Sequence, residues 1–213
     1  MSDAIDYDAV TAMLSAVVRR LRAARDELAA LDAATGDGDH GAAMCKVADA
    51  IEQSTGRDDQ SRIPELLSKI GWAVMGIDAG STGPLYGSFF LGMSEGCADA
   101  DGLDTARLAS ALEQGVAKLR QYSKAEPGDK TMLDALLPAV SAVRATAENG
   151  GSPAHALEAA ACAAEKGAEQ TSGMKAAFGR ARNIGDRSVG HVDPGAASMS
   201  LVFAGLKEGL THG

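Results

Sequence analysis

The sequence predicts an all-α protein, a single bundle of about eight helices, and three observations support that class. Apolar residues recur every three or four positions through most of the 213-residue chain, which is the period of one helix face. The composition is 46% hydrophobic but only 4% aromatic, and abundant alanine suits closely packed helices. Runs of β-branched residues as long as a strand are scarce. We expect one domain over residues 1–213.

Four helices are expected in the first half of the chain. The longest apolar pattern predicts one long first helix, and shorter patterns predict the next three. Pro64 falls in the first turn of the third helix, where the missing N–H of proline is tolerated, and the fourth helix follows Pro84. The four patterns cover residues 10–31, 44–51, 66–77 and 85–93.

Four more helices are expected in the second half. Pro138 lies inside the sixth helix and lacks the N–H of the helical ladder, so we expect a kink or local break there. Ser152 and Pro153 form a cap-like start for the seventh helix. These patterns cover residues 108–119, 132–147, 153–170 and 199–210.

Glycine-rich polar segments connect the helices, and four of them carry unusual combinations of residues. Alternate connections of a bundle lie at the same end, so these segments are expected to meet at one mouth and to carry the chemistry. They cover residues 36–41, 79–87, 126–131 and 179–195.

Charge and composition exclude several classes of partner. The formal charge of −9 argues against nucleic acid, because phosphate-backbone binding needs a basic face. Residues 1–8 are polar and acidic, unlike a signal peptide, and no apolar run approaches the ~20 residues of a membrane span. Cys45, Cys97 and Cys162 lack metal-ligand spacing and are expected to be buried free thiols. We expect a soluble cytoplasmic protein with no nucleic-acid or membrane partner.

Three aspartates around the first glycine-rich segment indicate a metal site. Asp32 falls at the carboxyl end of a predicted helix, where the dipole disfavours an acid. Asp37 and Asp39 are two positions apart, which points both carboxylates the same way in extended chain. Such a cluster suits Mg²⁺, which takes substrate phosphates as its remaining ligands. The alternative is an ordinary Asp-Gly turn with capping acids. A calcium loop is excluded, because Ala42 and Ala48 stand where glycine and glutamate are required.

The next two candidates are phosphate contacts at helix starts. His40 lies beside the start of the second helix, whose N–H groups and partial positive charge favour an anion, although it could also be a metal ligand or a plain loop residue. Ser81 and Thr82 lie in a glycine-rich helix start that suits a phosphate cradle, or equally an ordinary N-cap.

Two later segments add basic residues. Lys130 could neutralise phosphate, or its neighbours Asp129 and Thr131 could simply cap a helix; a Walker A loop is excluded by the spacing. Met132 could pack against a base or belong to the core. Segment 179–195 carries three arginines without helical periodicity, which is typical of a functional loop and also compatible with a solvated, salt-bridged one.

Together these segments resemble the L subunit of dihydroxyacetone kinase, the nucleotide-binding subunit of that phosphotransferase family. The matching stretches are GDGDHG at 36–41, GSTGPLYG at 80–87, EPGDKTM at 126–132, and GRA at 179–181 through DPG at 193–195. The similarity extends over almost the whole chain, in the order of the family. Each stretch alone is weak evidence for the family, whereas the four together at these spacings are highly specific for it.

The resemblance implies a barrel of eight antiparallel helices with the nucleotide at one end. It implies that Asp32, Asp37 and Asp39 hold two Mg²⁺ ions that bridge to the phosphates of ADP or ATP. Three positions depart from the family: Thr82 stands where serine is usual, Ala43 where a polar residue is common, and Ser123 where glycine is frequent. The implied nucleotide contacts are His40, Gly41, Ala42, Ala43, Ser81, Thr82, Ser123, Met132, Arg180, Asp193, Pro194 and Gly195.

The resemblance also implies an activity in glycerone and glycerol metabolism that depends on a partner. A separate K subunit would hold the ketose, and this chain alone is expected to be inactive as a kinase. The donor could be exchanging ATP, or bound ADP rephosphorylated by a phosphocarrier subunit of the phosphotransferase system. Alternatives are a stand-alone magnesium-dependent phosphoester hydrolase, a non-catalytic helical module, a subunit for another ketose such as erythrulose, or the nucleotide domain of a fatty-acid kinase. The length of the chain favours the small-ketose branch.

Overall fold

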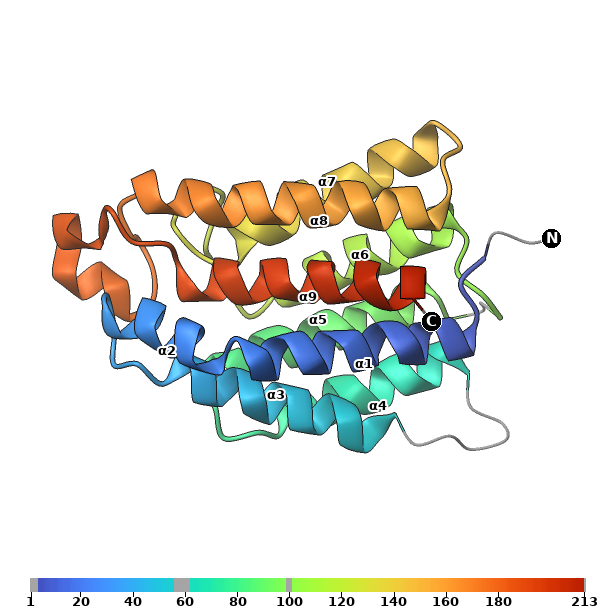
Figure 1. The fold of residues 1–213 in the computed structure, drawn as a ribbon, viewed down its shortest axis with the longest axis horizontal. Coiled ribbons are helices and arrows are strands. Elements are labelled where there is room, and N and C mark those ends of the chain that lie inside the picture. The colour runs from blue at the N-terminus through green and yellow to red at the C-terminus, as the bar shows by residue number, and fades with distance from the viewer. Residues whose placement is uncertain (1–3, 56–61, 99–100, 213) are drawn as a thin grey trace.

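A computed structural model describes residues 4–55, 62–98 and 101–212. These residues form nine α-helices and two short 3₁₀ helices (Figure 1). The α-helices are α1 (Tyr7–Ala23), α2 (Arg25–Ala33), α3 (His40–Ser54), α4 (Ile63–Met75), α5 (Thr82–Gly96), α6 (Thr105–Leu119), α7 (Leu133–Glu148), α8 (Pro153–Gln170) and α9 (Pro194–His212). The 3₁₀ helices, η1 (Thr171–Gly173) and η2 (Arg180–Ser188), lie between α8 and α9.

Eight helices pack side by side in a closed ring, in the order α1, α3, α4, α5, α6, α7, α8 and α9, with α9 returning to α1. Successive members run in opposite directions (Figure 1). Helix α2 lies outside the ring and packs against α3 at one end. The prediction of an all-α antiparallel barrel is confirmed.

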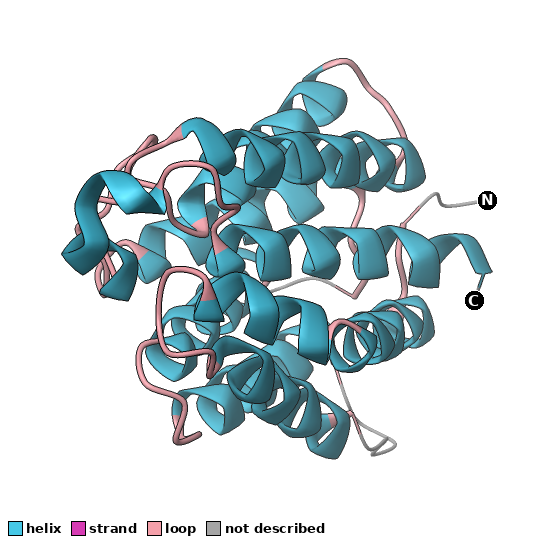
Figure 2. Ribbon diagram, turned by 60° about the vertical axis from the view of Figure 1, so that its left-hand side comes forward, coloured by secondary structure: helices cyan, strands magenta, loops and turns pink. Residues whose placement is uncertain are grey.

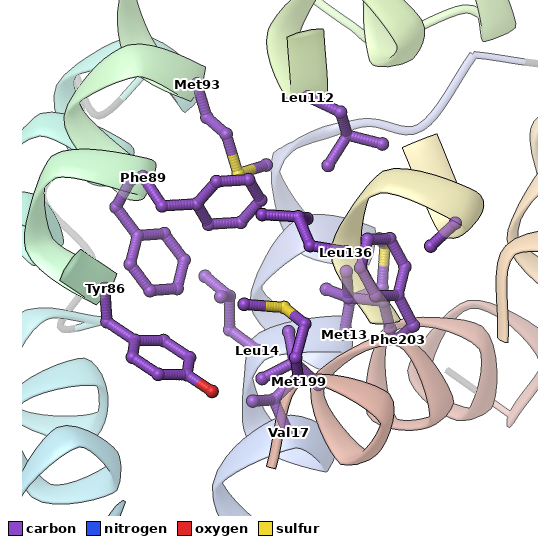
Figure 3. Close-up of a cluster of buried hydrophobic side chains, with 14 of the residues drawn as sticks. Met13, Leu14, Val17, Tyr86, Phe89, Met93, Leu112, Leu136, Met199 and Phe203 are labelled. Carbon is purple, nitrogen blue, oxygen red and sulfur yellow. The ribbon is translucent and has the colours of Figure 1, made fainter. Parts of the chain in front are cut away.

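Apolar side chains fill the interior of the ring, so the barrel is a packed core (Figure 3). Phe89 of α5, Met199 and Phe203 of α9 and Leu136 of α7 point toward one another there, and all are buried. Each side chain of this size contributes about 1.5–3 kcal/mol when it leaves water.

Glycine brings helix backbones close where α9 meets α1. A Cβ atom on Gly205 would lie 2.6 Å from Val17 Cα, and one on Gly209 would lie 2.3 Å from Met13 Cα. Since neither distance accommodates a side chain, these two glycines set the spacing of this helix pair.

Three sequence-based expectations need correction. The long first helix is two helices, because Ala24 leaves helical geometry (φ −88°, ψ 8°), and α2 then lies against α3. Helix α7 continues through Pro138, so the expected break is wrong, whereas a kink there stays a prediction. The carbonyl of Asp134, which Pro138 cannot bond, instead faces Gly167 of α8, where a Cβ would lie 2.1 Å away. Cys97 is buried as expected, but Cys45 is only half-buried and Cys162 is exposed.

In the part of the chain that the structure describes, no helix combines the length and apolarity that crossing a membrane requires.

The alternation of helix direction places four connections at one end of the ring, as expected. They join α2 to α3, α4 to α5, α6 to α7 and α8 to α9, and Figure 2 shows them gathered there. Helices α3, α5, α7 and α9 therefore all begin at this end.

Candidate metal and phosphate site

A cavity of about 650 Å³ opens where the four connections meet. Each of the four segments singled out in the sequence contributes to its wall. Of the predicted site residues, the wall includes Asp32, Asp37, Asp39, His40, Ser81, Thr82, Ser123, Met132, Arg180, Asp193, Pro194 and Gly195.

The three aspartates come together at the cavity. One carboxylate oxygen from each of Asp32, Asp37 and Asp39 lies within 4.8 Å of the others. Asp32 is only 9% exposed and lies in the last turn of α2. Its Oδ2 accepts a hydrogen bond from His40 N at 3.2 Å. The positive end of the α3 dipole therefore offsets the unfavourable position of Asp32 at the end of α2.

Two glycines allow the loop to turn tightly over this carboxylate. A Cβ on Gly36 would lie 2.5 Å from Asp32 Oδ1, so a side chain there would displace the acid. Gly38 has φ +79°, a left-handed conformation that glycine adopts without steric cost. The sequence GDGD thus brings both later aspartates back toward Asp32.

The carboxylate spacing fits a magnesium centre. Oxygens around one Mg²⁺ lie about 2.1 Å from the ion, and hence about 3.0–4.2 Å apart in an octahedron. The observed limit of 4.8 Å is close to this range. All three donors are hard oxygens, which suit Mg²⁺ more than Zn²⁺.

The cavity is also a favourable place for anions. Four helices begin beside it, and each helix start carries partial positive charge. At the start of α5, Ser81 is the N-cap residue, but its side chain makes no capping bond, so its hydroxyl is available to a ligand. Thr82 follows as the first residue of the helix.

Arg180 places a positive charge over the acids. It opens η2 in the long connection between α8 and α9, which bends at Gly185 (φ 59°, ψ −126°). The Arg180 guanidinium forms ion pairs with Asp37 and Asp39. A loop far along the chain thus reaches the acid cluster.

His40 is held by groups from two other helices. Its Nε2 lies 2.9 Å from Ser198 Oγ, and the same oxygen lies 2.9 Å from Tyr86 Oη. Burial lowers the pKa of His40, although Asp32 and a hydrogen bond to the Pro194 carbonyl oppose that effect. His40 therefore has a fixed orientation at the floor of the cavity.

Asp193 caps α9, with Oδ2 accepting the Ala196 N–H at 2.7 Å. Burial raises the pKa of Asp193 from 3.8 to about 7, although the Ala196 N–H and the charge of Lys130 favour the ionised form.

Lys130 lines the cavity, but its ammonium group is bonded to the backbone, and a phosphate contact by it stays a prediction. It is 2% exposed, and its Nζ donates to the backbone carbonyls of Thr171, at 2.5 Å, and His191. Burial lowers the pKa of Lys130, and nearby Asp193 and Asp134 oppose this.

Three predicted contacts lie away from the cavity wall. Gly41, Ala42 and Ala43 occupy the first turn of α3, and a Cβ on Gly41 would lie 2.1 Å from Arg25 O. Gly41 therefore packs α3 against α2, and nucleotide contact by these three residues stays a prediction. Sequence reasoning missed Tyr122 and Phe178, two aromatic residues of the cavity wall. Their only signal was proximity to segments 126–131 and 179–195.

Ring and cavity together define the class: an all-α barrel with an acid-lined cavity at one end. Residues 34–208 match the family model of the DAK2 domain, and the chain belongs to that family.

Among curated relatives, the chain is 36% identical over 176 residues to the "PEP-dependent dihydroxyacetone kinase, ADP-binding subunit DhaL" of Escherichia coli, covering 83% of this chain and 84% of the relative. It is 35% identical to an L-erythrulose 1-kinase of Mycolicibacterium smegmatis, covering 87% of this chain and 33% of the relative. A solved structure of the dihydroxyacetone kinase from C. freundii in complex with AMP-PNP and Mg²⁺ superposes with a TM-score of 0.73 at 30% identity, over 93% of this chain. The chain spans 33% of that kinase chain.

Proposed function

We propose that this protein binds magnesium and ADP or ATP in the cavity and serves as the nucleotide-binding subunit of a small-ketose kinase of the dihydroxyacetone type. One observation carries the proposal: three carboxylate oxygens lie within 4.8 Å of one another in a cavity where four helices begin. Acids alone would repel a nucleotide, and helix starts alone are common. Their combination suits a metal-bound phosphate chain.

Asp32, Asp37 and Asp39 would hold two Mg²⁺ ions. When bound, these ions neutralise phosphate charge and orient the phosphates for in-line transfer. The first turns of α3 and α5 offer backbone N–H groups, and Ser81 and Thr82 add hydroxyl groups.

Other parts of the wall suit the rest of the nucleotide. Arg180 can donate two parallel hydrogen bonds to phosphate oxygens. Met132 and Tyr122 offer apolar and aromatic surface of the kind that packs on a base, with Ser123 and the turn Asp193–Gly195 beside them. The residues of this wall hold and orient the nucleotide and keep part of its charge out of water.

The acceptor would come from a ketose-binding K subunit. Support comes from the E. coli relative, which is named a subunit of dihydroxyacetone kinase. The erythrulose kinase relative supports erythrulose as another acceptor. The name of the E. coli relative also supports phosphoenolpyruvate as the ultimate donor, through a phosphocarrier that regenerates the nucleotide on this chain.

Titration calorimetry with ADP tests the nucleotide site. The wild-type chain is expected to bind ADP with Mg²⁺ and to lose most affinity in EDTA. Asp37→Asn is expected to remove the magnesium-dependent part. Asp78→Asn is the matched control, because Asp78 is an exposed acid in the α4–α5 connection and does not line the cavity. Equal affinity of the two variants in Mg²⁺ would remove the metal assignment.

A reconstitution assay tests the partner. The chain is purified with a K-type subunit and assayed with dihydroxyacetone and erythrulose, using either ATP or phosphoenolpyruvate plus carrier proteins. Transfer is expected only with both subunits present. Hydrolysis of phosphate esters by this chain alone would instead favour a hydrolase.

A further inference from the structure

Lys130 is an unusual residue because a charged side chain is almost fully buried and bonds only backbone carbonyls. Its Nζ donates to Thr171 O and His191 O, which lie 41 and 61 positions further along the chain. These two carbonyls flank the long connection between α8 and α9 that carries Arg180. One ammonium group therefore joins both ends of that connection to the start of α7.

Other hydrogen bonds join the two ends of the same connection. Asp193 N donates to Thr171 Oγ1 at 2.8 Å, and Gly190 N donates to Ser172 O at 2.7 Å. The turn that carries Lys130 also touches the loop, since Ala177 N donates to Asp129 O at 3.1 Å. The loop, residues 172–190, is thus tied across its base and fixed to the α6–α7 connection.

The backbone at Lys130 supports a special role for its side chain. Among the non-glycine residues of the described ranges, Lys130 is the one with a positive φ, 61°. A left-handed turn favours glycine or asparagine, so a lysine here is disfavoured by its backbone. The turn is held by Asp134, whose carboxylate accepts N–H groups from Gly128 and Thr131.

We propose that Lys130 is a positioning residue whose ammonium group clamps loop 172–190 across the cavity and thereby sets the location of Arg180 over Asp37 and Asp39. Lys130 acts through the loop and does not itself contact phosphate. The nucleotide part of this inference rests on the proposed function, whereas the clamp itself does not.

Hydrogen–deuterium exchange of the nucleotide-free protein tests the clamp. Lys130→Met keeps the apolar stem and removes the charge, and amides of residues 172–190 are expected to exchange at least about tenfold faster. Lys124→Met is the matched control, because Lys124 lines the same cavity but is exposed. Unchanged exchange in a folded Lys130→Met protein overturns the proposal.

Lys130→Gly separates the ammonium from backbone strain. Glycine adopts the left-handed φ readily but cannot reach the two carbonyls. Faster exchange in both variants supports the clamp, and protection retained in Lys130→Gly overturns it. Should Lys130→Met fail to fold, Lys130→Gly alone decides.

Calorimetry with magnesium and ADP then tests the link to Arg180. Lys130→Met and Arg180→Ala are each expected to weaken binding, and the double variant is expected to be no weaker than Arg180→Ala alone. Additive losses would overturn action through Arg180 and indicate direct contact by Lys130. Absence of ADP binding in the wild-type chain would refute the proposed function and leave the clamp to the exchange experiment.

Discussion

Arg180 Nη1 lies 3.2 Å from Asp39 Oδ2, although 141 positions separate the two residues. The contact joins the last connection of the barrel to the first. It brings a permanent positive charge to the cluster of carboxylates that we propose as magnesium ligands. The position of the loop therefore decides the charge balance of the cavity.

Replacing Arg180 tests this balance. Arg180→Ala is expected to weaken ADP binding in magnesium by about 10- to 100-fold, because a hydrogen bond to a charged group contributes about 1.5–3 kcal/mol. Calorimetry measures the change. Arg182→Ala is the control, since Arg182 is exposed in the same 3₁₀ helix and lies outside the cavity wall. Similar losses in both variants would refute a specific role for Arg180.

A methyl group at position 36 is expected to disturb the acid cluster. In Gly36→Ala the new Cβ would press on Asp32 Oδ1, so binding of Mn²⁺, as a probe of the magnesium site, should weaken by about tenfold. Paramagnetic resonance of free Mn²⁺ measures this affinity. Gly76→Ala, whose new Cβ would have its nearest contacts at 3.6 Å, should bind Mn²⁺ as the wild type does.

The contact between α1 and α9 should tolerate no added volume. Gly205→Ala places a Cβ 2.6 Å from Val17 Cα, and we expect a loss of about 1–3 kcal/mol in the free energy of unfolding. Urea denaturation measures it. Gly173→Ala is the control, because its Cβ would meet no atom within 4 Å. Equal stability of the two variants would contradict the close packing described for this pair.

Asp193 should make stability depend on pH. In the folded protein the Asp193 carboxyl group keeps its proton up to about pH 7, whereas in the unfolded chain it releases the proton near pH 3.8. The folded state therefore binds more protons between these two pH values. The contribution of Asp193 to the free energy of unfolding should therefore fall as pH rises from about 4 to 7.

Asn at this position still caps the helix but cannot ionise. Relative to wild type, the free energy of unfolding of Asp193→Asn should rise by on the order of 1 kcal/mol when the pH is raised from 5 to 8. Urea denaturation of both proteins at the two pH values measures it. A fall in this relative free energy over the same pH range would show that Lys130 and the Ala196 N–H outweigh burial in setting the pKa of Asp193.

Sequence patterns predicted most of the helices, because a helix that buries one face repeats its apolar residues every three or four positions. Their arrangement in a ring was implied by the family resemblance. Sequence patterns also indicated the acid cluster, since Asp32, Asp37 and Asp39 are close along the chain. The break at Ala24 had no such signal: neither proline nor glycine occurs there, and the contact of α2 with α3 is tertiary.

The role that we propose for Lys130 was also beyond sequence reasoning. Its acceptors are main-chain carbonyls, which every residue possesses, and they come from positions far along the chain. Because these acceptors leave no mark in the sequence, a lysine between Asp129 and Thr131 was interpreted as a possible phosphate contact. Gly41 illustrates a similar ambiguity, because a glycine at a helix start serves close helix packing as well as it serves a ligand, and its nucleotide contact stays a prediction.

The even number of helices in the ring has a practical consequence. Helix α1 begins and α9 ends at the pole opposite the cavity (Figure 1). A fluorescent protein or an affinity tag fused beyond the start of α1 or the end of α9 would therefore lie on the side opposite the mouth of the cavity. The molecule can therefore be immobilised on a sensor chip through either of these helix ends while the mouth of the cavity stays open to solution.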